Sequence, residues 1–195
     1  RLAAAAARIT EGEIKQMAIT GQPDTRVEDY FDVIGGKTAV LFSAAAAAGI
    51  EITGALAEQV EAMRVYGLEL GMAFQIMDDA LDYTASAEQM GKNAGDDFAD
   101  QKITLPTILA WQDGDAEERA FWQRTLGEAD FAEGDLERAQ ALLAAHDAVN
   151  RSVAVAHDHA VKAGAALTPF IGDKRTAPLA RALADAALFA AHRAS

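Results

Sequence analysis

Three aspartates, Asp78, Asp79 and Asp82, lie in the otherwise largely apolar stretch FQIMDDALDY at residues 74–83. At about 100° per residue on a helix, Asp78 and Asp82 lie close together, with Gln75 beside them and Asp79 slightly further round. These four polar groups therefore border the apolar stripe of the helix instead of lying on its opposite, solvated face. Carboxylates at i, i+4 repel each other, and a hard divalent cation such as Mg²⁺ reverses that sign. The pattern predicts a metal site, against the alternative of a solvated acidic face.

A polar loop is expected after this helix, over residues 86–101, and it adds further charges. From Asp78 to Asp100 there are seven acidic residues and one basic residue, Lys92, and Lys102 follows at the start of the next helix. A metal can bridge phosphate oxygens while lysines neutralise the remaining charge, so this arrangement is suited to hold a diphosphate. For the loop acids alone, an ordinary solvated acidic run is the better interpretation.

The elements that would position these groups are helices. Hydrophobic residues make up 51% of the 195 residues, enough for one core, so we expect one all-α domain over residues 1–195. Gly35 and Gly36 fall inside the second helix and predict a kink or a close approach there. The expected helices cover residues 2–20, about 26–48, 55–84 and 103–111, with two or three more after 118, broken at 127–130, 134 and 168–176. The third carries an apolar stripe of Val60, Met63, Gly67, Leu70, Phe74, Met77 and Leu81.

Composition and charge exclude several classes of protein. The chain has 17 Lys and Arg against 30 Asp and Glu, and its net charge of −13 is poorly suited to nucleic acid or an anionic membrane surface. It has no cysteine, which excludes disulfides and thiolate metal sites. The longest apolar run, Ala39–Ile50, is too short to cross a bilayer, so no transmembrane span is expected. No secretory leader is visible, which predicts a cytoplasmic location, and the start at Arg1 suggests a longer protein.

Two other candidate sites fail on spacing. Gly36, Lys37 and Thr38 resemble the end of a phosphate-binding P-loop, but the motif needs a glycine where Phe31 stands and a preceding strand. The histidines could suggest a helical metal phosphohydrolase. All four lie at or after residue 146, however, and those at 157 and 159 point about 200° apart on a helix. Neither site is retained.

The stretch from Phe74 to Asp82 resembles the second aspartate-rich motif of the trans-isoprenyl diphosphate (polyprenyl) synthases. Glu-Gly-Glu at residues 11–13 with Gln16, and Gly-Lys-Thr-Ala at 36–39, are similar to helix motifs of the same family. GKNAGDD at 91–97 and KITLP at 102–106 are similar to the long-chain members, the octaprenyl to decaprenyl synthases. The resemblance is strong over most of residues 5–110 and loose beyond them.

The resemblance implies an isoprenoid synthase-type bundle of antiparallel helices around a deep central cavity. In this family an allylic diphosphate ionises, isopentenyl diphosphate attacks the allylic cation, and a proton is lost. Mg²⁺, with Mn²⁺ as a substitute, would offset the charge that develops on the departing diphosphate. Phe74 and Met77 would help to line a dry cavity that protects the cation from water.

The resemblance also implies a role for each matching residue. Asp78 and Asp82 correspond to Mg²⁺ ligands, and Asp79 to a ligand or to a residue that supports one. Asp97 would orient a metal-bound water. The lysines that grip the allylic diphosphate would be Lys37, Lys92 and Lys102. The residues implied to act in catalysis are Lys37, Thr38, Gln75 and Asp78, with Thr38 and Gln75 near the allylic carbons and the departing oxygen.

The family's first aspartate-rich motif, and the basic residues that bind isopentenyl diphosphate, are absent from this sequence and are expected before Arg1. The chain alone is therefore expected to be inert, with the N-terminal helices of the bundle missing. For the full-length protein we expect a homodimer that makes a long trans-polyprenyl diphosphate, such as a quinone (ubiquinone) side-chain precursor. The alternative is a non-catalytic regulatory subunit of a heteromeric synthase. A terpene cyclase or squalene-type synthase ranks lower, because those enzymes usually lack the Gly-Lys-Thr and Gly-Lys-x-x-Gly-Asp patterns.

Overall fold

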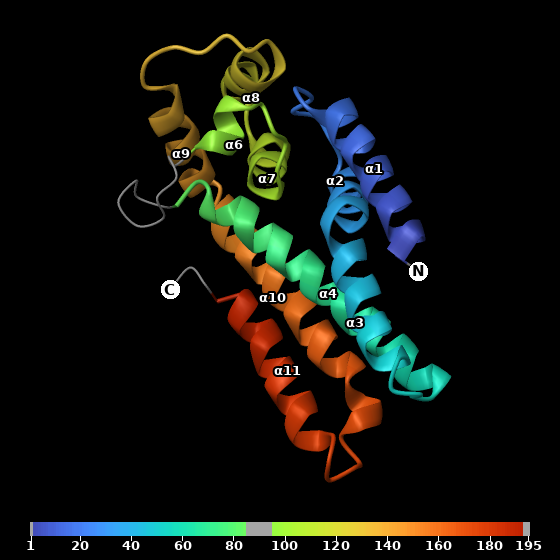
Figure 1. The fold of residues 1–195 in the computed structure, drawn as a ribbon. Coiled ribbons are helices and arrows are strands. Elements are labelled where there is room, and N and C mark those ends of the chain that lie inside the picture. The colour runs from blue at the N-terminus through green and yellow to red at the C-terminus, as the bar shows by residue number, and fades with distance from the viewer. Residues whose placement is uncertain (1, 85–94, 193–195) are drawn as a thin grey trace.

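A computed structural model describes residues 2–84 and 95–192, and this part of the chain contains helices and no strand. The expected all-α class is thus confirmed. The elements, labelled as in Figure 1, are α1 (Leu2–Ile19), α2 (Val27–Ile34), the π-helix η1 (Gly35–Ala39), α3 (Val40–Glu51), α4 (Ala57–Leu81), α6 (Asp96–Ala99), α7 (Leu105–Asp113), α8 (Ala116–Trp122), the π-helix η2 (Gln123–Gly127), α9 (Asp135–Ala145), α10 (Ala148–Ala166), the 3₁₀-helix η3 (Thr168–Phe170) and α11 (Ala177–Ala190).

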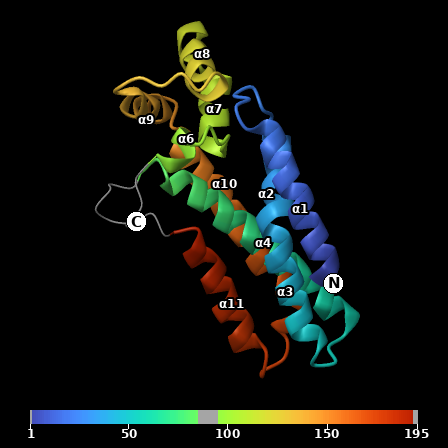
Figure 2. The ribbon, with the colours of Figure 1, turned by 45° about the horizontal axis from the view of Figure 1, so that its top comes forward.

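The two long helices α4 and α10 run antiparallel through the centre of the bundle (Figure 1). On one side, α3 packs along α4, and α1 packs against α2 and η1; α11 covers the lower half of α10. The short helices α6 to α9 gather at the end where α4 finishes, as Figure 2 also shows. The predicted apolar stripe of α4 is buried at Val60, Gly67 and Met77 and half-buried at its other positions. Met77 and the neighbouring Ile76 are fully buried and belong to the same core as Ile108 of α7. The end of α4 that carries the aspartates is therefore covered by the short helices.

Glycines allow α3 and α4 to approach closely. A Cβ at Gly67 would lie 2.4 Å from the carbonyl oxygen of Phe42, and a Cβ at Gly71 would lie 2.6 Å from Cα of Ala39. Neither contact leaves room for a methyl group without moving backbone. These glycines fix the distance between α4, which carries Gln75, Asp78 and Asp79, and the segment formed by η1 and α3, in which η1 carries Lys37 and Thr38.

The chain after residue 115 differs from the sequence-based expectation. Four α-helices follow, α8 to α11, where two or three were expected. The unpredicted break lies between α9 and α10, where Asp147 adopts a left-handed backbone conformation with φ of 51°. Aspartate tolerates this conformation better than most residues, but the sequence around it contains no glycine or proline to mark a turn. In addition, α7 begins at Leu105, with Pro106 in its first turn as expected.

The helical stretch Val27–Glu51 is long and apolar enough to cross a membrane by length and composition alone, with 25 residues and a mean hydropathy of 1.6. The apolar run considered from the sequence covers only Ala39–Ile50. In the structure α2, η1 and α3 follow one another without a break, so the helical stretch is longer than that run. One such helix is weak evidence of a span, since core helices pass the same test. Here α3 packs along α4, and Ser43 Oγ donates a hydrogen bond to the carbonyl oxygen of Arg64 (2.9 Å).

Candidate active site

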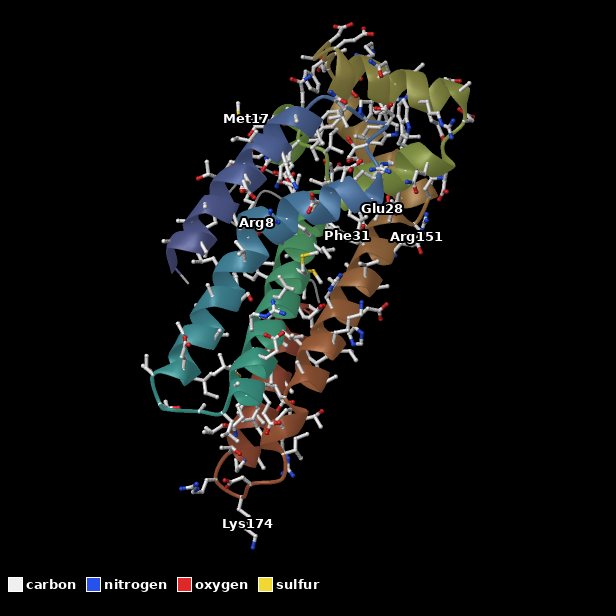
Figure 3. All side chains as sticks on the ribbon, turned by 90° about the vertical axis from the view of Figure 1, so that its right-hand side faces the viewer. Arg8, Met17, Glu28, Phe31, Arg151 and Lys174 are labelled. Carbon is white, nitrogen blue, oxygen red and sulfur yellow. The ribbon has the colours of Figure 1, made fainter. Side chains whose placement is uncertain are left out.

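Lys37 and Thr38 lie in the π-helical segment η1, between α2 and α3. A π-turn inserts one extra residue into a helix and is common at functional sites. The segment is made possible by Gly12 of α1, because a Cβ there would lie 2.4 Å from the backbone nitrogen of Lys37. The kink or close approach predicted at Gly35–Gly36 is therefore present, and α1 is the partner. Figure 3 shows this side of the molecule, with Arg8 and Met17 labelled on α1 and Phe31 on α2.

Two side chains of α1 hold the Lys37 ammonium group. Its Nζ donates to Oε1 of Gln16 at 2.7 Å and lies 3.2 Å from Oε1 of Glu13. The Lys37 side chain keeps 34% of its surface exposed, so it can still reach an anion. The Glu-Gly-Glu motif and Gln16, which the sequence singled out only by resemblance, thus have a physical role: they place α1 and orient Lys37.

A hydrogen bond between Thr38 and Gln75 joins η1 to α4. The Thr38 hydroxyl donates to Oε1 of Gln75 at 2.9 Å, and Nε2 of Gln75 donates to Oδ1 of Asp79 at 2.9 Å. The predicted neighbourhood of Thr38, Gln75 and Asp79 is therefore present. The amide oxygen of Gln75 faces η1, and its nitrogen faces the carboxylate.

Asp79 is the most deeply buried of the three aspartates, with 0% exposed surface. Besides Gln75, its carboxylate accepts hydrogen bonds from the Tyr30 hydroxyl (2.7 Å, to Oδ2) and from Nζ of Lys102 (2.8 Å, to Oδ1). A buried carboxylate requires such partners, and these come from α2, α4 and the segment before α7. Asp79 therefore ties three parts of the fold together, and its carboxylate is shielded from solvent.

Lys102 and Asp97 form the second part of this network. Nζ of Lys102 lies 2.8 Å from Oδ2 of Asp97, and only 23% of the lysine side chain is exposed. Burial lowers the pKa of Lys102, but the carboxylates of Asp79 and Asp97 outweigh it and the pKa rises, so the lysine stays charged. Burial raises the pKa of Asp97 to about 6, against the opposing effect of Lys102. Lys102 was predicted to grip a diphosphate, and in this structure its charge is already shared by two carboxylates.

Asp78 and Asp82 are the more accessible aspartates of the motif. Asp78 is exposed, and within residues 2–84 and 95–192 its carboxylate has no hydrogen bond or ion pair with another residue. Asp82 is half-buried, burial raises its pKa, and its Oδ2 accepts a hydrogen bond from the backbone nitrogen of Asp97 at 3.0 Å. The carboxylates of Asp78 and Asp82 are thus both accessible to a cation. Within residues 2–84 and 95–192, no group of three acidic or histidine side chains is placed to hold a metal.

The charge around this motif still favours a cation. Four carboxylates, Asp78, Asp79, Asp82 and Asp97, stand against two ammonium groups, Lys37 and Lys102, in the described part of the site. Carboxylate oxygens separated by one helical turn, as on Asp78 and Asp82, are ligands suited to Mg²⁺. The donor chemistry therefore fits the metal that the sequence predicted, with Asp79 as a supporting residue. Lys92, the other predicted diphosphate ligand, lies outside the described residues.

The hollow beside these groups is small. It measures about 30 Å³ and is lined by Gln16, Tyr30, Val33, Ile34, Lys37, Gln75, Asp79, Lys102 and Ile103. Ligand pockets usually measure about 300–1,000 Å³, so the described residues do not enclose the deep cavity that was expected here. Met77, which was expected to line the deep cavity, does not border this hollow; it is buried and borders a separate space toward α10 and α11. Phe74 instead packs against Phe42 of α3, with ring centroids 5.6 Å apart.

Sequence reasoning missed Tyr30. It lies two helical turns before Lys37, and that spacing was the available signal, because residues seven apart share a helix face. Nothing in the local sequence indicates that its hydroxyl would meet Asp79, which lies 49 residues further along the chain.

Comparison with known proteins assigns the chain to a family. The polyprenyl synthetase family model matches residues 1–143. The chain belongs to the polyprenyl synthetase family. A decaprenyl diphosphate synthase structure from Rhodobacter capsulatus superposes with a TM-score of 0.91 at 41% identity, covering 100% of this chain and 58% of that one. The helical bundle is therefore that of the isoprenoid synthases, as expected.

Two further members of the polyprenyl synthetase family are informative. A Caulobacter crescentus polyprenyl synthase, solved with calcium and isoprenyl diphosphate, has a TM-score of 0.92 at 40% identity and is covered over 58% of its length. An octaprenyl diphosphate synthase from Haemophilus influenzae is 35% identical over 155 residues, or 80% of this chain and 47% of that protein. The chain thus spans about half the length of the curated relatives it matches.

Proposed function

We propose that this chain carries the allylic diphosphate site of a trans-polyprenyl diphosphate synthase, which condenses an allylic prenyl diphosphate with isopentenyl diphosphate head to tail. The observation that carries the proposal is the chain of hydrogen bonds from Thr38 through Gln75 and Asp79 to Lys102, with Lys37 next to Thr38 in η1 and held by Gln16. Its members come from η1, α4 and the segment before α7, and each matches a family motif. A helical bundle that only scaffolds a partner needs no such alignment of charge, which favours an enzyme over a regulatory subunit.

The first chemical step would be departure of the diphosphate from the allylic carbon. Negative charge grows on the leaving group, and Lys37, held by Gln16 and partly exposed, is placed to face it. Asp78 and Asp82 would hold Mg²⁺, or Mn²⁺ in its place, and the bound metal would neutralise part of the diphosphate charge. The Caulobacter relative was solved with calcium and isoprenyl diphosphate, which supports a divalent cation and a prenyl diphosphate as ligands of this fold.

The cation left behind would be stabilised by oxygen atoms of the same network. Thr38 Oγ1 and Gln75 Oε1 lie 2.9 Å apart, and both carry partial negative charge. Oriented dipoles of this kind stabilise developing charge without having to reorganise during the reaction. The substrates and the product follow from the family: isopentenyl diphosphate, an allylic primer and a long polyprenyl diphosphate. The long product, and its use as a quinone side chain, are supported by relatives named octaprenyl and decaprenyl diphosphate synthase.

The test is incorporation of radiolabelled isopentenyl diphosphate onto an allylic primer by the full-length protein. The Asp78→Ala variant should lose most of the Mg²⁺-dependent incorporation. Asp24→Ala, at an exposed turn outside the site, should retain it. Full Mg²⁺-dependent turnover by Asp78→Ala would refute the assignment of the metal site.

A further inference from the structure

The Tyr30 hydroxyl is a buried donor that the reaction described above does not use. Tyr30 is 1% exposed, and its hydroxyl donates to Oδ2 of Asp79 at 2.7 Å. Burial, and then the neighbouring carboxylate of Asp79, raise the pKa of Tyr30 well above its usual value. The hydroxyl therefore remains protonated at any working pH and always donates.

This donor divides the carboxylate of Asp79 into two different oxygens. Oδ2 accepts from Tyr30, whereas Oδ1 accepts from both Nε2 of Gln75 and Nζ of Lys102. Without Tyr30, the buried Oδ2 would have no donor in the described part of the site, and the carboxylate would be free to rotate toward the remaining two. The hydroxyl thus fixes which oxygen faces Gln75.

The orientation of the Gln75 carboxamide follows from Asp79. A carboxylate accepts and does not donate, so the amide must present its nitrogen to Asp79. Its oxygen is then directed to the other side, where it accepts from the Thr38 hydroxyl at 2.9 Å. A flipped amide would place oxygen against oxygen at Asp79 and nitrogen against a hydroxyl that already has a donor role.

We propose that Tyr30 is a positioning residue for Gln75: by holding Oδ2 of Asp79, it fixes the carboxamide so that the Gln75 oxygen faces the allylic carbons. This rests on the proposed function in one respect, the place of the allylic carbons beside Thr38 and Gln75. The fixed direction of the amide rests on the hydrogen bonds alone. A loosened amide would lower the stabilisation of the cation while leaving the diphosphate contacts in place.

The kinetic test compares Tyr30→Phe with Tyr66→Phe in the full-length protein. Tyr66 is a matched control, because its hydroxyl also donates from a largely buried ring, but to the carbonyl oxygen of Leu183 (2.9 Å), away from the site. Small misplacements of a catalytic group cost up to about 100-fold, so Tyr30→Phe should lower kcat by about 10- to 100-fold with little change in KM for the allylic diphosphate. Tyr66→Phe should leave both nearly unchanged.

A double-mutant cycle separates positioning from general loosening of the fold. In a Gln75→Leu background, adding Tyr30→Phe should change kcat by less than about twofold, because the group it positions is gone. An undiminished effect in that background would overturn the proposal, and so would a Tyr30→Phe variant that keeps full kcat.

A readout independent of activity is the side-chain amide resonance of Gln75 in ¹⁵N-glutamine-labelled protein, assigned by its loss in Gln75→Leu. Tyr30→Phe should shift or broaden this resonance, and Tyr66→Phe should not. An unmoved resonance would overturn the proposal even if the enzyme is active. A moved resonance in a protein that elongates no primer would instead refute the proposed function and leave the positioning of Gln75 in place.

Discussion

Replacing Asp79 with alanine should destabilise the protein strongly, because this carboxylate connects three elements. The substitution leaves the fully buried Tyr30 hydroxyl without an acceptor, which costs about 1–3 kcal/mol. Removing one partner of a buried ion pair costs about 3–5 kcal/mol. The lower end applies, because Lys102 is 23% exposed and keeps Asp97 as a partner. We therefore expect the free energy of unfolding to fall by about 4 kcal/mol, of which the unpaired hydroxyl accounts for about 1 kcal/mol.

The assay is urea unfolding of the full-length protein followed by far-ultraviolet circular dichroism. Asp158→Ala, an exposed acid on α10, is the control and should change the free energy of unfolding by no more than about 0.5 kcal/mol. Adding Tyr30→Phe to Asp79→Ala should recover about 1 kcal/mol, since it removes the unpaired hydroxyl. If Asp79→Ala lies within about 1 kcal/mol of wild type, the network does not hold α2, α4 and α7 together as argued.

Three further predictions follow from the site. Gly12→Ala should lower the free energy of unfolding by about 1–3 kcal/mol because its Cβ would lie 2.4 Å from Lys37 N, whereas Gly172→Ala, with open space around it, should not; equal melting temperatures would contradict this. Folded Asp97, with a pKa of about 6, binds more protons than the unfolded state between about pH 4 and 6. Wild type should therefore lose stability relative to Asp97→Asn as pH rises through that window, and a constant difference in urea midpoints would refute the assignment. Asp82→Ala should raise the Mg²⁺ concentration for half-maximal activity about tenfold or more, and an unchanged Mg²⁺ titration would exclude Asp82 as a ligand.

Much of the fold could be predicted because the apolar periodicity is strong. The stripe along α4 marks its buried face, and the glycine pair in the second helix marks the interruption at η1. The break at Asp147 could not be predicted, because an aspartate adopts the left-handed conformation there and no neighbouring glycine or proline marks the turn. The π-turn itself depends on Gly12 of another helix. Such a contact between distant segments cannot be predicted from the sequence of either segment alone.

The sequence predicted which residues gather at the site more fully than it predicted how each of them is oriented. Helical geometry predicted that Gln75 lies beside Asp78 and Asp82 with Asp79 slightly further round, and in the structure Gln75 donates to Asp79, its i+4 neighbour. It could not show that Asp79 turns inward and Asp78 outward, because that difference is decided by Tyr30 and Lys102, which approach from α2 and from the segment before α7. The same tertiary contacts pair Lys102 with two carboxylates, and its role as a ligand of the diphosphate stays a prediction.

Chromatography of the product made by the full-length protein from an allylic primer, isopentenyl diphosphate and Mg²⁺ tests the central claim most directly. The account predicts prenyl diphosphates that are longer than the primer by whole isoprene units and that disappear when Mg²⁺ is withdrawn. Unextended primer, or its hydrolysis alone, in the presence of Mg²⁺ would contradict it.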